Sequence, residues 1–190
     1  MISLLINSLA DLRLNQAVRK QCPINSLGTF ICASEIKTIE HERIIFVENL
    51  AVMADLSLLN IPEPLKNALW LYRGDQQSHK NTGTANQFFK QFKNSHTLVC
   101  FSDLDPQGIQ IAQESGATHW LTITDKNDLN IKLKGVENEW FNQKTAISYL
   151  NNQQLTPHQQ IIFNDMKKTQ KTLKQEHMIA HSLRLDLFEI

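Results

Sequence analysis

Four short apolar runs recur through the middle of the chain, and a segment with helical spacing of apolar residues follows each of the first three. The runs are too short for helices and suit strands buried on both faces. Strands that alternate with helices at this spacing predict right-handed βαβ units and a mostly parallel sheet. The predicted strands are residues 43–47, 68–72, 96–101 and 118–123, and the predicted helices are residues 49–59, 84–92 and 107–115.

The segments on either side of this region have other patterns. Apolar residues at positions 2, 5, 6, 9, 12 and 14 predict a short amphipathic helix within residues 1–20. Residues 29–34 favour a first or edge strand, residues 125–142 are polar and irregular, and further helices are predicted at residues 143–152 and 157–178. The expected organisation is an N-terminal helix with a connector and edge strand (1–40), an α/β core (41–125) and a C-terminal helical extension (126–190).

The composition indicates a folded protein of the cytoplasm. Hydrophobic residues make up 42% of the 190 residues, the three cysteines form no CxxC pair, and the N-terminus lacks the basic segment of a signal peptide. The apolar runs are far too short to span a membrane. The formal net charge is zero, whereas a free-standing DNA-binding protein usually carries a basic surplus. Contact with nucleic acid would therefore be local or shared with a partner.

Acidic residues follow two of the predicted strands. Glu48 comes directly after the first core strand, and Asp103 and Asp105 follow the third. Ligands of open α/β sheets bind beyond the carboxyl ends of the strands, and alternate residues of an extended segment point the same way. The three carboxylates would then share one crevice and repel one another unless a cation offsets their charge. This arrangement predicts a site for Mg²⁺ or Mn²⁺, which prefer oxygen ligands.

A structural interpretation of the same residues stays open. Asp105 followed by Pro106 suits the N-cap and first position of a helix, and the sequence from Asp105 to Gly108 also suits a type I turn. Glu48 can equally be an ordinary exposed acid after a strand. The spacing alone does not choose between a metal site and these structural roles.

Two motifs resemble a known fold. Residues 47–51 (VENLA) and residues 101–108 (FSDLDPQG) resemble the Glu and Asp-x-Asp motifs of the Toprim fold. The Asp-x-Asp-Pro-x-Gly form, which includes Gly108, is similar to that of the topoisomerase VI A subunit and of the Toprim half of the Wadjet plasmid-defence nuclease subunit. Residues 173–177 (LKQEH), which include Glu176, are similar to the ending of that nuclease.

The resemblance implies a Rossmann-like Toprim core with a four-stranded sheet. Glu48 would be a general acid/base or a metal ligand, and Asp103 and Asp105 would bind Mg²⁺. Asp75 lies where relatives carry a glycine-rich turn, but the sequence Arg73-Gly74-Asp75 departs from that pattern, so Asp75 is only a secondary candidate for the site. Topoisomerase relatives also carry a winged-helix domain with a nucleophilic tyrosine before the Toprim core. Here Tyr72 and Tyr149 lie in apolar stretches, so we expect hydrolysis rather than strand passage.

Two functions follow as alternatives. The first is a Mg²⁺-dependent nuclease or nicking component of a defence or DNA-processing complex, for which the resemblance suggests DNA as substrate, an SMC-like ATPase as partner and homodimers. The second is a non-catalytic Toprim module that binds a partner protein or a nucleic-acid end. A haloacid-dehalogenase-type phosphatase or a phosphorylation receiver fits less well, because the order of the acidic residues differs.

A lysine stripe is predicted beside the apolar face of the last helix. Lysines on one helix face can follow a phosphate backbone, although such a stripe is more often a solvated surface. Both interpretations stay open for these residues and for Glu176 at the end of the helix. The lysines are Lys167, Lys168, Lys171 and Lys174.

Overall fold

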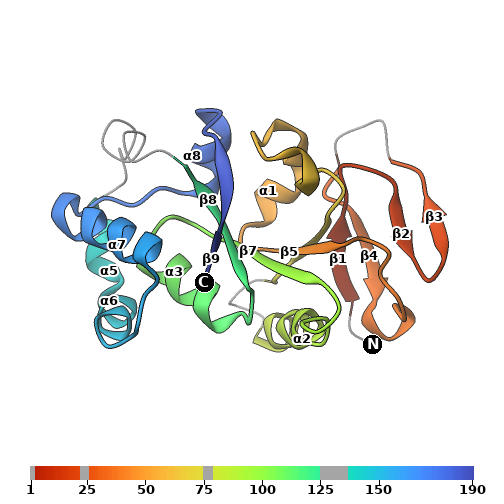
Figure 1. Ribbon diagram of the computed structural model, residues 1–190, viewed down its shortest axis with the longest axis horizontal. Helices are drawn as coiled ribbons and strands as arrows, with labels where there is room; N and C mark the ends of the chain where they lie inside the picture. Colours follow the sequence, from red (N-terminus) through yellow and green to blue (C-terminus); the bar gives the residue numbers. More distant parts are fainter. Residues whose placement is uncertain (1–2, 22–25, 75–78, 125–136) are drawn as a thin grey trace.

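The computed structural model describes residues 3–21, 26–74, 79–124 and 137–190. In these ranges the chain forms a mixed α/β structure, with helices on both sides of one central sheet (Figure 1). The seven strands of the sheet lie in the order β4-β1-β6-β5-β7-β8-β9. Their bounds are β1 (Ser3–Asn7), β4 (Thr29–Cys32), β5 (Arg43–Val47), β6 (Leu69–Tyr72), β7 (Thr97–Phe101), β8 (His119–Ile123) and β9 (Leu185–Glu189).

The centre of the sheet is parallel, as the four apolar runs predict. Strands β6, β5, β7 and β8 run in one direction and are buried along most of their length. Antiparallel strands extend both edges, with β1 and β4 beside β6 and with β9 beside β8. The expectation of four strands was therefore wrong, because segments from residues 1–40 and 126–190 add edge strands to the same sheet.

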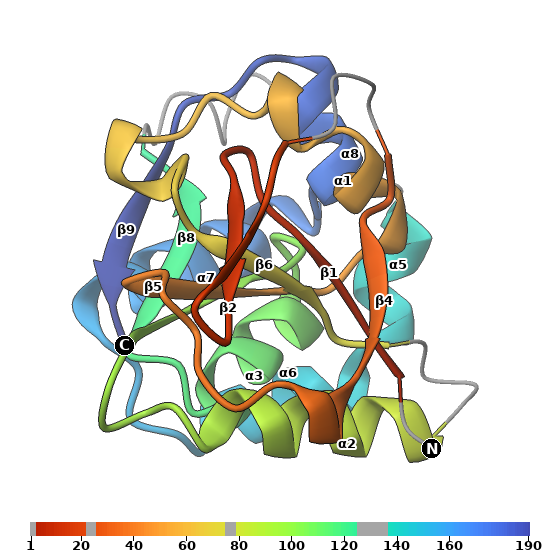
Figure 2. The ribbon, with the colours of Figure 1, turned by 90° about the vertical axis from the view of Figure 1, so that its right-hand side faces the viewer.

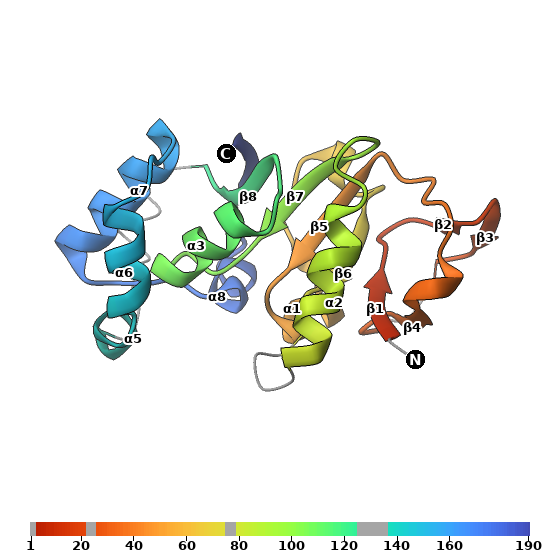
Figure 3. The same ribbon diagram turned by 90° about the horizontal axis from the view of Figure 1, so that it is seen from below.

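Helices cover the two faces of the parallel strands. Phe89 in α2 packs in one buried cluster with Phe46, whereas Met53 in α1 packs with Ile45 and Val47 on the opposite face. Figure 3 shows α2 in front of the central strands, and Figure 2 shows α1 and α8 together on the other side. The helix bounds are α1 (Leu50–Ala54), α2 (His79–Lys90), α3 (Pro106–Glu114), α5 (Glu137–Asn142), α6 (Lys144–Asn151), α7 (Pro157–Thr169) and α8 (Gln175–Ala180).

The helix predicted within residues 1–20 is wrong. This segment forms β1 and a separate hairpin of β2 (Leu12–Leu14) and β3 (Ala17–Arg19). Asn15 and Gln16 connect β2 and β3 with φ angles of 54° and 61°, which are typical of a tight hairpin turn. Leu4, Leu5 and Ile6 are all buried because β1 lies inside the sheet, so the strand lacks the alternation that would identify it.

The helix predicted at residues 157–178 is also wrong, because two helices replace it. Thr156 and Gln159 form a capping box at the start of α7, and the helix ends where Gln170 adopts a left-handed conformation with φ 54°. In the connector, Leu173 forms a β-bridge with Leu104, and α8 begins two residues later. The polar stretch before residue 143 gives no sign of α5, and β9 lies beyond the last predicted helix.

The order of the parallel strands creates a switch point. The chain passes from β5 to its neighbour β6 and then crosses over to β7, which lies on the opposite side of β5. Val47 at the end of β5 is in register with Tyr72 of β6 and with Phe101 of β7. The carboxyl ends of these three strands therefore meet at one edge, where α/β sheets bind their ligands.

Candidate functional site

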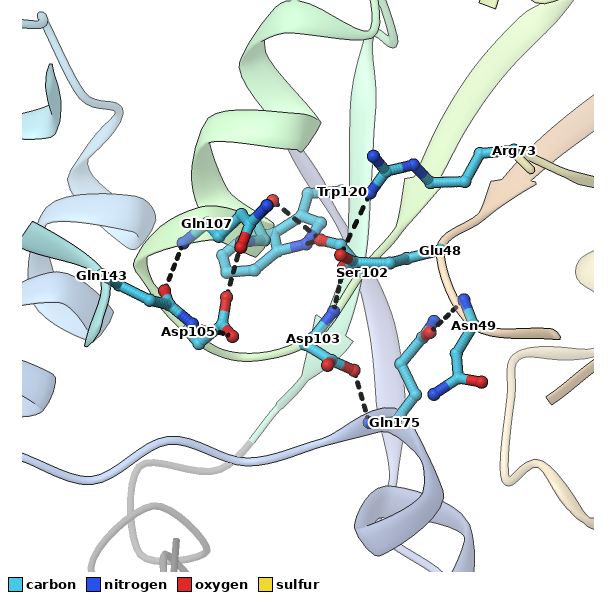
Figure 4. Close-up of polar contacts among 11 residues, drawn as sticks. Glu48, Asn49, Arg73, Ser102, Asp103, Asp105, Gln107, Trp120, Gln143 and Gln175 are labelled. Atoms are coloured by element: carbon cyan, nitrogen blue, oxygen red, sulfur yellow. Dashed lines mark hydrogen bonds and ion pairs between the residues drawn. The ribbon is translucent and has the colours of Figure 1, made fainter. Parts of the chain in front are cut away.

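Glu48 lies at this switch point. The parallel hydrogen bonding continues one residue past β5, because the N–H of Glu48 donates to the carbonyl oxygen of Phe101 at 3.0 Å. On the other side, the N–H of Arg73 donates to the carbonyl oxygen of Val47 at 3.0 Å. The backbone thus fixes Glu48 between the residues that follow β6 and β7 (Figure 4).

The side chain of Glu48 joins these two neighbours. Its Oε1 accepts a hydrogen bond from Nη1 of Arg73 at 3.1 Å, and its Oε2 accepts one from the N–H of Asp103 at 3.0 Å. The side chains of Arg73 and Glu48 are only 10% and 18% exposed, so this ion pair is largely shielded from water. The structure therefore brings two of the predicted residues, Glu48 and Asp103, into direct contact.

Asp103 is held from the side opposite to Glu48. Its Oδ1 accepts a hydrogen bond from the N–H of Gln175 at 2.8 Å, and Oε1 of Gln175 in turn accepts one from the N–H of Asn49 at 2.9 Å. The β-bridge between Leu104 and Leu173 fixes this part of the C-terminal segment against the loop after β7. A residue 72 positions further along the chain thus contacts the Asp103 carboxylate.

Asp105 has the structural role that its sequence allows. It is the N-cap of α3, where its Oδ1 accepts a hydrogen bond from the N–H of Gly108 at 2.6 Å, and Pro106 occupies the first helical position. Its Oδ2 accepts a hydrogen bond from Nε2 of Gln143 at 2.6 Å. Figure 4 shows this side chain turned toward Gln143, away from the carboxylate of Asp103.

A buried hydrogen-bond network fixes the loop between β7 and α3. The hydroxyl of Ser102 donates to the carbonyl oxygen of Gly108 at 2.9 Å and accepts a hydrogen bond from Nε1 of Trp120 at 3.0 Å. Ser102 and Trp120 are both fully buried. Since buried polar groups are costly without partners, this network holds the positions of Asp103 and Asp105.

Burial and mutual repulsion shift the carboxyl groups toward their neutral forms. Burial, followed by the charge of Asp105, raises the pKa of Glu48 from 4.5 to about 7. Burial, followed by the charge of Glu48, raises the pKa of Asp103 from 3.8 to about 8. The pKa of Asp105 is raised by burial as well, although its bonds to Gln143 and Gly108 oppose the shift. The positive charge of Arg73 thus opposes the rise in the pKa of Glu48 without cancelling it.

These shifts predict how the stability of the metal-free protein depends on pH. Between about pH 4.5 and about pH 8 the folded state retains protons on Glu48 and Asp103 that the unfolded state has released, so the free energy of unfolding should fall as the pH rises through this window. Each pKa unit corresponds to about 1.4 kcal/mol, so a loss of several kcal/mol is expected. Urea unfolding in the presence of EDTA measures it, and a free energy that stays constant or increases over this range would contradict it.

The remaining predicted residues have different positions. Oε1 of Glu176 accepts a hydrogen bond from Nδ2 of Asn49 at 2.6 Å, and its buried Oε2 has no hydrogen-bond partner among the described residues. The charge of Glu176 also contributes to the raised pKa of Glu48 and of Asp103, so this residue belongs to the same acidic cluster. Asp75 lies outside the described residues.

The four lysines do not form one stripe, because the predicted helix is divided. Lys167 donates to Oδ1 of Asn151 at 2.6 Å, and Lys174 forms an ion pair with Glu139 at 2.7 Å. Both lysines are thus directed toward other parts of the protein. The set comprises Lys167 and Lys168 in α7, Lys171 in the connector and Lys174 at the N-cap of α8.

Glu48 and Asp103 line an open cavity of about 280 Å³ together with Arg73 and Gly74. Arg73, Gln143 and Gln175 are site residues that the sequence analysis did not single out. Arg73 carried a signal, since it follows a core strand at the same edge as Glu48. Gln175 lies in the segment 173–177 that resembles the nuclease ending, but nothing in the sequence paired it with Asp103. Gln143 carried no signal, because only the tertiary structure brings its helix to this edge.

The donor set can be tested against a divalent cation. Among the described residues, no group of three or more His, Cys, Asp or Glu side chains is arranged to hold a metal ion. Mg²⁺, however, commonly uses one or two carboxylates and completes its shell with water and phosphate. Glu48 and Asp103 provide this smaller number of carboxylates. Burial, and after it neighbouring carboxylates, raises the pKa of both groups, and a bound cation would oppose these shifts. As arranged, Asp105 would have to leave Gln143 to join them.

The comparisons with known proteins give a family but no activity. The model of a family described as a domain of unknown function (DUF7281) matches residues 2–187. No curated protein matches the sequence. Within the described residues, no helix has the length and apolar character needed to cross a membrane.

Proposed function

The chain belongs to the DUF7281 family, and we propose that it is a Toprim-type, Mg²⁺-dependent nuclease that nicks DNA, acting as a component of a defence or DNA-processing complex. One observation carries this proposal. Glu48 and Asp103 follow adjacent parallel strands at the switch point, the Glu48 carboxylate accepts a hydrogen bond from the backbone N–H of Asp103, and both residues line an open cavity. The Toprim-like motifs at residues 47–51 and 101–108 provide these two residues.

The residues of the site suit the cleavage of a phosphodiester. Mg²⁺ held by Glu48 and Asp103 would polarise the phosphodiester and favour a hydroxide nucleophile. If Asp103 alone holds the cation, Glu48 would instead be free to act as the general acid/base of the reaction. Asp105 and Ser102 position the loop that carries Asp103. The zero net charge suggests that a partner subunit contributes to DNA binding, and an SMC-like ATPase is the partner we propose.

A plasmid assay tests the proposed activity. With Mg²⁺ or Mn²⁺, the protein should convert supercoiled plasmid to the open circular form, and EDTA should abolish the reaction. Glu48→Gln should reduce the rate by about 100-fold or more, since it removes the carboxylate that would bind the metal or transfer the proton. Glu63→Gln is the matched control, because Glu63 is an exposed acid paired with Lys66 on the surface. Equal nicking by wild type and Glu48→Gln would reveal a contaminant and contradict the proposal.

A second candidate is a non-catalytic Toprim module that binds a partner or a nucleic-acid end. It is favoured by the protein contacts of all three carboxylates, since Arg73, Gln175 and Gln143 occupy oxygens that a metal would use. This candidate predicts that the protein takes up no Mn²⁺ in calorimetry. Saturable Mn²⁺ binding that depends on Asp103 would exclude it.

A further inference from the structure

Arg73 is a largely buried cation whose guanidinium has unused donors among the described residues. Its side chain is only 10% exposed, and among the described residues its guanidinium has one partner, Oε1 of Glu48. A guanidinium carries five N–H donors in a planar fork, and a carboxylate that it binds fully accepts two of them. The contact with Glu48 therefore uses only part of the guanidinium, and the other nitrogens remain available toward the cavity that Arg73 lines.

The unused donors are next to the cavity of about 280 Å³. Arg73 lines this cavity together with Glu48, Asp103 and Gly74, and it is the single cation among the lining residues. Gly74 follows directly with φ 89°, a conformation that favours glycine. Figure 4 shows the guanidinium beside the Glu48 carboxylate, with a second terminal nitrogen directed away from that contact.

We propose that this cavity is a phosphate subsite, in which Arg73 binds the phosphate group through the guanidinium nitrogens that Glu48 leaves unused. The proposal rests on the proposed nuclease function and identifies the residue that positions the substrate phosphate. A phosphate suits the planar fork because two of its oxygens can accept two parallel N–H bonds from the guanidinium. These bonds would satisfy the donors that Glu48 does not use.

The charges in the cavity make the binding conditional. Two carboxylates and one guanidinium line the cavity, so ionised side chains leave it with an excess of negative charge that repels an anion. A divalent cation on Glu48 and Asp103 reverses this excess. It also competes with Arg73 for Glu48, which leaves the guanidinium available to the phosphate. Phosphate binding should therefore require the cation.

The test measures two ligands on purified protein, with inorganic phosphate and Mg²⁺ as probes. Wild type should bind phosphate only in the presence of Mg²⁺. Arg73→Gln should weaken Mg²⁺-dependent phosphate binding by about 10- to 100-fold, as expected for the loss of charge-assisted hydrogen bonds. The same variant should bind Mg²⁺ several-fold more tightly, because a competing positive charge is gone. A purely structural arginine would not shift the two affinities in opposite directions.

Two further variants serve as a matched control and as a conservative substitution of Arg73. Arg43→Gln removes an arginine from the other end of β5, where it pairs with Glu42 on the surface, and should change neither affinity. Arg73→Lys retains the charge without the planar fork, so it should fold and lose part of the phosphate affinity. If Arg73→Gln fails to fold, the comparison of Arg73→Lys with wild type decides.

The outcomes separate this inference from the proposed function. Phosphate binding that is unchanged in Arg73→Gln and Arg73→Lys, or absent from wild type at saturating Mg²⁺, would overturn the subsite. Arg73-dependent phosphate binding without plasmid nicking would sustain the subsite and contradict the nuclease. Nicking by wild type, together with normal phosphate binding by both Arg73 variants, would support the nuclease and contradict the subsite.

Discussion

Replacing Gly108 by alanine should lower the free energy of unfolding by about 3 kcal/mol or more, which corresponds to a fall in Tm of about 6–12 °C for a chain of this size. A Cβ at this position would lie 1.9 Å from the carbonyl oxygen of Asp103 and 2.9 Å from its carbonyl carbon. Both atoms belong to the backbone, so no side-chain rotation relieves the clash. The loop that carries Asp103 would have to move.

The control is another helical glycine. Gly83 lies in α2, and a Cβ there would meet no atom within 4 Å. Gly83→Ala should stabilise the protein by about 0.5–1 kcal/mol, because alanine has the higher helix propensity. Thermal and urea unfolding of the two variants would separate the clash from this propensity. If Gly108→Ala proved as stable as Gly83→Ala, the close approach of α3 to the Asp103 backbone would be refuted.

Asp103→Asn should have opposite effects on stability and on activity. At about pH 8 and without metal, the variant should be more stable than wild type by on the order of 2 kcal/mol, or about 4–8 °C in Tm. The substitution removes a charge that burial and Glu48 both disfavour. An asparagine oxygen can still accept the hydrogen bond from the N–H of Gln175. The gain should shrink as the pH falls and vanish near pH 4, because Asp103 is then protonated in the unfolded chain as well as in the folded wild type.

The same substitution should remove the metal site. Mn²⁺ should raise the Tm of wild type at about pH 8, since a ligand that binds the folded state stabilises it, but it should leave Asp103→Asn unchanged. Plasmid nicking should fall by about 100-fold or more. Calorimetric unfolding with and without Mn²⁺ provides the measurement. An Asp103→Asn protein that is less stable than wild type at both pH values would show that the ionised carboxylate supports the fold.

The stability gain and the loss of activity have one physical cause. The fold places Glu48 and Asp103 side by side with little solvent, and Arg73 offsets only part of their charge. A site that is destabilised in this way is typical of positions kept for function rather than for folding. Both predictions on Asp103 therefore test whether the acidic cluster is there to bind a cation.

The sequence by itself determined the parallel centre of the sheet and the edge at which the site lies. Strands buried on both faces appear as continuous apolar runs, and the residue after each run must lie at the carboxyl end of its strand. Glu48 and Asp103 could therefore be assigned to one crevice without coordinates. Asp105 with Pro106 likewise revealed a helix start, because the N-cap signal is local.

Only the tertiary structure decided the edge strands and the partners of the carboxylates. β1 has no alternating pattern because it is buried within the sheet, and its apolar residues fit a helix equally well. The bond from Gln175 to Asp103 and that from Gln143 to Asp105 join residues distant in sequence. Local periodicity reports which faces of a segment are apolar, whereas such contacts depend on how whole elements pack. Packing therefore placed Gln143 against Asp105 and Gln175 against Asp103, and no short stretch of sequence encodes these contacts.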